Sequence, residues 1–223
     1  MDKKLFFQAI FKFLCGFVII ALLLFVPAGT LRYPGAWLLM AILFAPMFLA
    51  GIVMMFKSPE LLRRRLNAKE EQPEQKQVIA CSALIFLAAF ILAGLNFRFG
   101  WAVMPRGAVL AAAAVFLAAY LLYAEVLREN VYLSRTVEVQ ENQTVIDSGL
   151  YGIVRHPMYA ATILLFLSMP LVLGSPVSFA VMLLYIPLIV KRIRNEEAVL
   201  EAGLDGYAEY MRRVRYRLIP FVW

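Results

Sequence analysis

The chain of 223 residues is too apolar for a water-soluble protein. Hydrophobic residues make up 63% of it and charged residues 17%, whereas soluble domains have about 45–50% and about 25%. A soluble core of this size cannot hide the excess, because the surface must still be covered by polar groups. The composition also excludes a disordered chain and a disulfide scaffold. We therefore predict an integral membrane protein with an all-α fold, a polytopic bundle of helices.

The rare residue types exclude several kinds of site. The chain has one histidine and two cysteines, Cys15 and Cys81, and each cysteine lies inside an apolar run, so no metal-site spacing is present. No glycine-rich phosphate loop follows a strand pattern. The net charge of +7 is more typical of cytoplasmic loops in a membrane protein than of a nucleic-acid surface. We expect neither a metal nor a nucleic acid among the ligands.

Four apolar runs are long enough to cross a bilayer, which takes about 20 helical residues. They cover residues 5–27, 35–56, 78–97 and 106–127. A further run over 157–190 is interrupted by Pro170 and then by Gly174-Ser175-Pro176. Glycine can end one helix, serine can cap the next and proline fits its first turn. This pattern predicts a Pro-broken hairpin of two helices of about 15 residues that enters and leaves the membrane on one side.

The positive charges predict the orientation of the chain. Of the 22 Lys and Arg residues, only Arg32, Arg98 and Arg106 fall on one side of these spans and 19 fall on the other. Cytoplasmic loops carry such an excess, so we expect both termini and the active site to be cytoplasmic. The predicted regions are an N-terminal transmembrane hairpin (1–56), a cytoplasmic interfacial loop (57–77), a second transmembrane hairpin (78–127) and a cofactor-binding region with a cytoplasmic tail (128–223).

The 57–77 loop contains a short amphipathic pattern. Ser58-Pro59 is a helix start, and an apolar stripe of Leu61, Leu62 and Leu66 runs beside Arg63-Arg64-Arg65. We interpret this segment as an interfacial helix whose arginines meet anionic lipid headgroups. A role in substrate gating is the alternative.

Polar residues gather just before the 157–190 hairpin. Asp147-Ser148-Gly149 is a turn signal, and Tyr151, Arg155, His156 and Tyr159 follow it within nine residues. Pro157 suits the first helical position, which leaves His156 as the N-cap of an electropositive helix end. This end could attract an anionic ligand group. The alternative is that His156 only caps the helix and Arg155 meets lipid headgroups.

The segment after the hairpin carries a second polar group. Arg192 and Glu196 are four residues apart and therefore share one helical face, an arrangement that an ordinary surface ion pair would also explain. Tyr207 and Tyr210 are expected to pack a second short helix rather than touch a ligand. Glu125, near the end of the fourth span, is expected to pair with Arg128.

Taken together, these motifs resemble a known group. The elements are Gly149-Leu150-Tyr151, Arg155-His156-Pro157-Met158-Tyr159, the apolar hairpin, Arg192-x-x-x-Glu196-Glu197, and Tyr207-x-x-Tyr210 before Leu218-Ile219-Pro220. The pattern resembles the isoprenylcysteine carboxyl methyltransferase family and the related phospholipid methyltransferases. It covers roughly residues 140–220, with a weaker echo in Ser58-Pro59-Glu60-Leu61.

The resemblance implies S-adenosylmethionine as the cofactor, bound at the cytoplasmic face, and a lipophilic or lipidated acceptor beside membrane lipids. The family's cofactor contacts fall on Gln143, Thr144, Val145, Ile146, Tyr151, His156, Pro157, Tyr159 and Glu196. The family's acceptor-contacting arginine falls on Arg192, so that Arg192, Glu196 and His156 are the implied catalytic residues. Gln143 stands where the family often has histidine.

The chemistry of the acceptor decides which residues are needed. A carboxylate is already ionised and needs no general base, and Arg192 could dock it as a fork-shaped donor. An amine, as in a phospholipid headgroup, would require a base, for which His156 and Glu197 are the candidates. A carboxylate acceptor such as a prenylcysteine is therefore favoured. A nicotinamide-dependent sterol-type reductase and a non-enzymatic transporter or scaffold are the alternatives from other classes.

Overall fold

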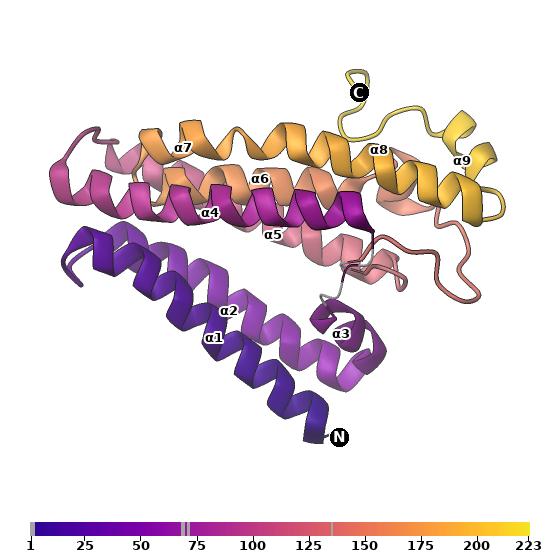
Figure 1. Ribbon diagram of the computed structural model, residues 1–223, viewed down its shortest axis with the longest axis horizontal. Coiled ribbons are helices and arrows are strands. Elements are labelled where there is room, and N and C mark those ends of the chain that lie inside the picture. The colour runs from indigo at the N-terminus through magenta and orange to yellow at the C-terminus, as the bar shows by residue number, and fades with distance from the viewer. Residues whose placement is uncertain (1–2, 68–69, 71, 135) are drawn as a thin grey trace.

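The computed structural model describes residues 3–67, 70, 72–134 and 136–223, and over these residues it is helical with no strand (Figure 1). Positions 68–69, 71 and 135, which belong to the predicted loop 57–77 and region 128–223, lie outside the described residues. The helices are α1 (Lys3–Ala28), α2 (Pro34–Lys57), α3 (Pro59–Leu66), α4 (Pro73–Phe99), α5 (Arg106–Glu129), the 3-10 helix η1 (Gly149–Gly152), α6 (Pro157–Val172), α7 (Pro176–Met182), α8 (Tyr185–Gly203) and α9 (Tyr207–Arg213).

The predicted all-α membrane bundle is confirmed. Four of the long helices, α1, α2, α4 and α5, coincide with the four predicted spans, although α4 begins five residues earlier than 78, at Pro73. Five segments of the described chain are long and apolar enough to cross a membrane, these four and Pro176–Gly203, which joins α7 to α8. The outgoing arm of the predicted hairpin is the shorter apolar helix α6, with 16 residues.

The sequence signals at the hairpin tip act as predicted, with one exception. Gly174 has a positive φ of 72°, which favours glycine, and the Ser175 hydroxyl accepts a hydrogen bond from the Ser178 backbone N–H at 3.2 Å. The prediction that Pro170 interrupts the helix is wrong, because α6 continues through it to Val172. A proline near the end of a helix removes only one of the last backbone hydrogen bonds.

The spans pack through apolar contacts, and close approach between two of them depends on a glycine. α1 packs against α4, and α5 packs against α6. A Cβ atom built on Gly94 of α4 would lie 2.7 Å from the Leu24 carbonyl oxygen of α1. Between the N-terminal helices and the hairpin tip, the buried Tyr33 hydroxyl donates to the Leu173 carbonyl at 2.6 Å.

The polar parts of the chain collect at one end of the bundle. In Figure 1, α3, α9, both chain termini and the long connection after α5 lie in the right-hand half of the view, and the tight turns between α1 and α2 and between α4 and α5 lie at the left. This arrangement puts both termini at the same end, in agreement with the predicted topology. The side of the membrane on which that end lies stays a prediction.

Candidate active site

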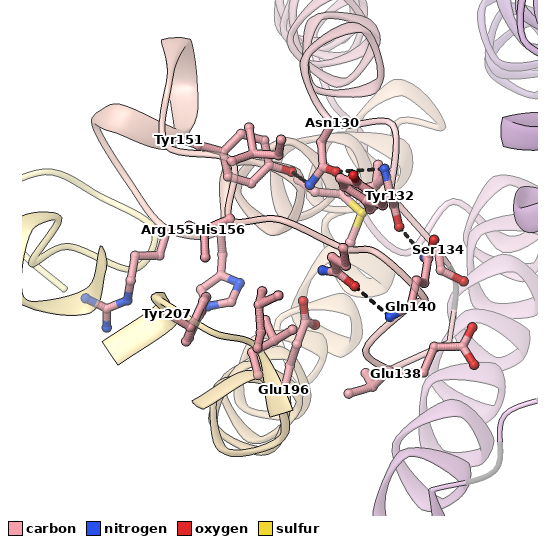
Figure 2. Close-up of a pocket in the computed structure, with 18 of the residues that line it drawn as sticks. Asn130, Tyr132, Ser134, Glu138, Gln140, Tyr151, Arg155, His156, Glu196 and Tyr207 are labelled. Carbon is pink, nitrogen blue, oxygen red and sulfur yellow. Dashed lines mark hydrogen bonds between the residues drawn. The ribbon is translucent and has the colours of Figure 1, made fainter. Parts of the chain in front are cut away.

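One pocket lies at the polar end, between the connection that follows α5 and the helices α6, α8 and α9. It holds about 840 Å³ of space free of protein atoms, part of which is open solvent. Figure 2 shows His156 and Tyr207 on one side of it, Gln140 and Ser134 on the other, and Glu196 below.

One wall of the pocket is the irregular segment 130–146. Asn130 is the first residue of this segment. Its side chain accepts a hydrogen bond from the Tyr132 N–H at 3.0 Å and donates one to the Tyr151 hydroxyl at 3.0 Å. Further along, the Gln143 amide oxygen accepts from the Gln140 backbone N–H at 2.8 Å, and the Gln140 amide donates to the Tyr132 carbonyl at 2.6 Å. These side chains satisfy backbone groups that no helix or sheet pairs here.

A glycine turn leads from this wall to α6, as the sequence predicted. Gly149 has a φ of 52°, and the carboxylate of Glu129 lies directly against it and accepts from the Leu150 N–H at 3.0 Å. A Cβ atom on residue 149 would meet the Glu129 carboxylate, and the positive φ favours glycine as well. The turn delivers Tyr151 to the pocket and places His156 at the N-cap and Pro157 at the start of α6.

Glu197 of α8 is the centre of a buried ionic network. Its Oε1 accepts from Arg155 Nε at 2.7 Å and lies 3.2 Å from His156 Nε2, and its Oε2 accepts from Arg217 Nε at 2.7 Å. Arg155, His156 and Glu197 are each 7% exposed or less. Two arginines on one carboxylate keep it ionised, which makes Glu197 a weak candidate for the general base that the sequence left open.

The C-terminal segment completes this network through its backbone. The Arg155 guanidinium donates to the Val214 and Arg215 carbonyls, and the backbone N–H groups of Arg155 and His156 donate to the Tyr216 and Arg217 carbonyls at 2.9 Å. The interpretation that Arg155 meets lipid headgroups is therefore wrong. Sequence spacing could not reveal this, because the partners lie about 40 and 60 residues away.

His156 occupies the predicted N-cap position, but its side chain does not cap the helix. A carboxylate can only accept, so the hydrogen between Glu197 and His156 is on Nε2 of the imidazole. This contact holds the ring against α8 at the edge of the pocket.

Tyr159 links the two polar residues of α8 that the sequence placed on one face. Its hydroxyl donates to the Glu196 carboxylate and accepts from Arg192 Nε at 2.8 Å. The Arg192 guanidinium also lies over the Tyr159 ring, 5.9 Å from its centre. Arg192 and Glu196 are thus joined through a hydroxyl from α6, and all three residues line the pocket.

Gln75 of α4, which sequence reasoning missed, binds the Arg192 guanidinium. Gln75 is fully buried, its Oε1 accepts from Arg192 Nη1 at 2.8 Å, and its Nε2 donates to Asn195 Oδ1 at 2.5 Å. Asn195 donates in turn to Glu74 at 2.8 Å. No motif marks Gln75, since it is one of several polar residues at the start of an apolar helix.

Three tyrosines form a buried aromatic side of the pocket. Burial raises the pKa of the Tyr151, Tyr207 and Tyr210 hydroxyls well above the usual value, so they are neutral at physiological pH. The Tyr210 hydroxyl donates to the Tyr151 carbonyl at 2.8 Å. Tyr207 and Tyr210 do pack α9 in place, as predicted, but both also line the pocket.

The structure brings almost every predicted site residue to this pocket. The predicted residues that line it are Gln143, Thr144, Val145, Ile146, Tyr151, His156, Tyr159, Arg192 and Glu196. Pro157 is buried beside it in the first turn of α6. The residues between 130 and 140 were not predicted, because their side chains form no motif. Their contacts with a ligand and those of the predicted residues stay predictions.

A match to a known family covers the region that builds most of this site. Residues 109–202 match the model of the isoprenylcysteine carboxyl methyltransferase family. These residues are less than half of the chain, and over them the chain is similar to that family. The region runs from α5 nearly to the end of α8 and so contains every predicted site residue. The predicted resemblance is confirmed, although the matched region starts before 140 and ends before α9.

Curated relatives of this family region include reductases. The chain is 32% identical over 91 residues to the Delta(14)-sterol reductase of Mus musculus. These residues make up 40% of this chain and 22% of that protein. It is 37% identical over 82 residues to the Delta(14)-sterol reductase of Arabidopsis thaliana, 35% of this chain and 22% of that protein. The matches thus span about a fifth of the length of these curated relatives.

The eukaryotic intramembrane Ras methyltransferase isoprenylcysteine carboxyl methyltransferase superposes with a TM-score of 0.48 at 15% identity, covering 96% of this chain and 84% of that one.

Proposed function

We propose that this protein is an integral membrane methyltransferase that uses S-adenosylmethionine to methylate a carboxylate on a lipophilic, prenylcysteine-like acceptor. The observation that carries the proposal is that eight of the nine cofactor residues implied by the sequence line one pocket, and Arg192 lines it with them. The residues come from the connection after α5, η1, α6 and α8, and they fall within the family region.

The groups around the pocket fit this cofactor. S-adenosylmethionine supplies a methyl group on a positively charged sulfur, and it also carries an ammonium group, a carboxylate and an adenosine. The Glu196 carboxylate can bind the ammonium group, and the faces of Tyr151 and Tyr207 can favour a cation. The buried Oε1 of Gln140 has no hydrogen-bond partner among the described residues, so this wall also offers an acceptor to a ligand or a water.

Arg192 is the residue that we assign to the acceptor. Its guanidinium is charged at all physiological pH values and its planar fork matches a carboxylate. Tyr159 and Gln75 hold its Nε and Nη1 atoms, which fixes the orientation of the guanidinium at the pocket. Methyl transfer is an in-line displacement that depends on positioning, and a fixed arginine serves this purpose.

The buried network removes one of the two bases that an amine acceptor could use. An amine must lose a proton, and Glu197 is unsuited to take it because it is bound by Arg155, Arg217 and His156. The Nε2–H of His156 is directed to the same carboxylate, so Nδ1 of the neutral ring is the nitrogen that could still accept a proton. A carboxylate acceptor attacks as the anion and needs no base.

Binding of S-adenosylhomocysteine to the protein in nanodiscs tests the cofactor. We expect saturable binding that Glu196→Gln weakens about tenfold or more, because a hydrogen bond to a charged group contributes about 1.5–3 kcal/mol. Glu201→Gln is the matched control, since Glu201 is exposed on the same helix. A folded wild-type protein that binds no S-adenosylhomocysteine would contradict the proposal.

Methyl transfer to two probes tests the acceptor. With N-acetyl-S-farnesyl-L-cysteine we expect a base-labile methyl ester and its loss in Arg192→Gln. Transfer to phosphatidylethanolamine instead would show that the acceptor is a lipid amine.

A nicotinamide-dependent reductase is the second candidate, because the curated relatives are sterol reductases. Such an enzyme needs cations for the phosphates of NADPH. Of the two arginines that line the described pocket, Arg155 is already bound to Glu197, which leaves Arg192 alone for several phosphate groups and disfavours this candidate. Saturable NADPH binding without S-adenosylhomocysteine binding would establish it.

We also propose that the pocket faces the cytoplasm, since the positive-inside rule places the polar end there. The exposed Asp205 lies beside it, between α8 and α9. In a chain with Cys15 and Cys81 replaced by alanine, Asp205→Cys should react with a membrane-impermeant maleimide in inverted vesicles and stay unlabelled in intact cells. Labelling in intact cells would reverse the orientation.

A further inference from the structure

The arginines of α3 contact the pocket wall, which the sequence interpretation of an interfacial helix did not anticipate. Arg64 Nη1 donates to the Val131 carbonyl at 2.7 Å, and Arg65 donates to the Ser134 carbonyl at 3.4 Å and to the Tyr123 hydroxyl of α5. Both acceptor carbonyls belong to the 130–146 wall. α3 begins at Ser58-Pro59 as predicted. Two of its three arginines, Arg64 and Arg65, contact the pocket wall rather than lipid headgroups.

The segment after α3 makes a third contact with the same wall. The buried Glu70 carboxylate accepts from the Val137 backbone N–H at 3.2 Å. Contacts from residues 64, 65 and 70 therefore reach the backbone of residues 131, 134 and 137, one every third residue. Ser134 and Val137 line the pocket directly.

The apolar side of α3 packs behind the wall. Leu61 is buried in a cluster with Val126 of α5, Leu133 of the wall and Tyr151 of η1. Leu133 and Tyr151 both line the pocket. α3 thus contacts the pocket wall in two ways. Leu61 packs against it through apolar contact, and Arg64 and Arg65 donate hydrogen bonds to it.

This support matters because the described part of the wall forms no helix or strand. An irregular segment has no regular backbone pairing, so its carbonyl and N–H groups need partners from elsewhere. Charge-assisted hydrogen bonds from arginine are among the strongest partners. Without them the segment would gain conformational freedom that a ligand must then remove on binding.

We propose that Arg64 and Arg65 are positioning residues for the cofactor. Neither arginine lines the pocket, and both act through the backbone of residues 131–134, which they hold in the ligand-binding conformation. This inference rests on the proposed function, since it takes S-adenosylmethionine as the ligand.

The experiment measures S-adenosylhomocysteine affinity and amide hydrogen exchange in nanodiscs. Arg64→Gln and Arg65→Gln should each raise the Kd about tenfold and accelerate exchange in residues 130–140, with α5 and α6 unchanged. Arg64→Lys should keep near wild-type affinity, because a lysine ammonium can donate to the same carbonyl. Arg63→Gln is the control on the same helix, since Arg63 is exposed and lies 3.7 Å from Glu60.

Two results would overturn the inference. One is wild-type affinity and exchange in Arg64→Gln and Arg65→Gln. The other is faster exchange throughout the spans, which would mean general destabilisation rather than positioning. If wild-type protein binds no S-adenosylhomocysteine, the proposed function fails, and the exchange of ligand-free protein still decides whether the arginines hold the wall.

Discussion

The N-terminal hairpin and the C-terminal region of this protein are held together by different forces. α1 and α2 present apolar side chains to their surroundings, with Phe7 at 68% and Phe56 at 72% exposure, and they join the bundle through close apolar contact. The C-terminal region buries Arg155, His156 and Glu197 in one ionic network. Lipid is as apolar as the spans, so shape decides packing in the first region, whereas electrostatics decides it in the second.

This difference predicts where single substitutions have large effects. Removing a methyl group from a lipid-facing span leaves the lipid to fill the space. Removing one charge from a buried network leaves its partners buried and unpaired, which is costly in free energy. Four substitutions test the comparison, from the largest expected effect to the smallest.

Glu197→Gln should have the largest effect. It leaves the Arg155 and Arg217 guanidinium groups facing a neutral amide, and breaking a buried ion pair costs about 3–5 kcal/mol of unfolding free energy. SDS titration of the purified protein measures this loss. The exposed Glu201→Gln on the same helix is the control, and an equal effect of both variants would contradict the role of the network.

Gly94→Ala should come next and act on the other region. The added methyl group would meet the Leu24 carbonyl at 2.7 Å, and such overpacking costs about 1–3 kcal/mol. Gly51→Ala in α2 has open space around it and should instead stabilise its helix by about 0.5–1 kcal/mol. S-adenosylhomocysteine affinity should be unchanged in both variants. A change in affinity would show that the two regions are coupled.

Gln75→Leu should alter the acceptor rather than the cofactor. It removes the amide that holds Arg192 Nη1, so the KM for N-acetyl-S-farnesyl-L-cysteine should rise about tenfold, the equivalent of one hydrogen bond to a charged group. The Kd of S-adenosylhomocysteine should stay near the wild-type value. If both constants rise together, Gln75 is a packing residue only.

Leu121→Ala should have the smallest effect. Leu121 is 74% exposed on α5, so the unfolding free energy should change by no more than about 0.5 kcal/mol. Phe116→Ala on the same helix is the contrast, since Phe116 is fully buried and its truncation should cost about 3–5 kcal/mol. SDS titration compares the two, and similar losses would place Leu121 in an interface.

Much of the fold could be predicted because its signals are local. The four long spans follow from apolar runs, and the hairpin tip follows from Gly174, Ser175 and Pro176, whose effects depend only on their neighbours in the chain. The turn at Gly149 and the N-cap position of His156 could be predicted for the same reason. Pro170 was misjudged because the cost of a proline depends on how much helix follows it.

The site could be predicted only where a motif marks it. Arg155-His156-Pro157 and the Arg192 to Glu196 spacing are short-range patterns, and the pocket indeed forms around these residues. The network around Glu197, the support by Gln75 and the contacts of Arg64 and Arg65 join residues 20 to 120 positions apart. No spacing along the chain records such contacts.

The amino-acid sequence alone determined that this is a helical membrane protein, where its four long spans lie and which family its C-terminal region resembles, because hydropathy and motifs are properties of neighbouring residues. Only the tertiary structure decided which charges neutralise one another. Arg155 binds Glu197 instead of the lipid headgroups, and Arg64 and Arg65 of α3 bind the pocket wall. The physical reason is that a buried charge takes the nearest partner in space, and the packing of the helices determines which residue that is.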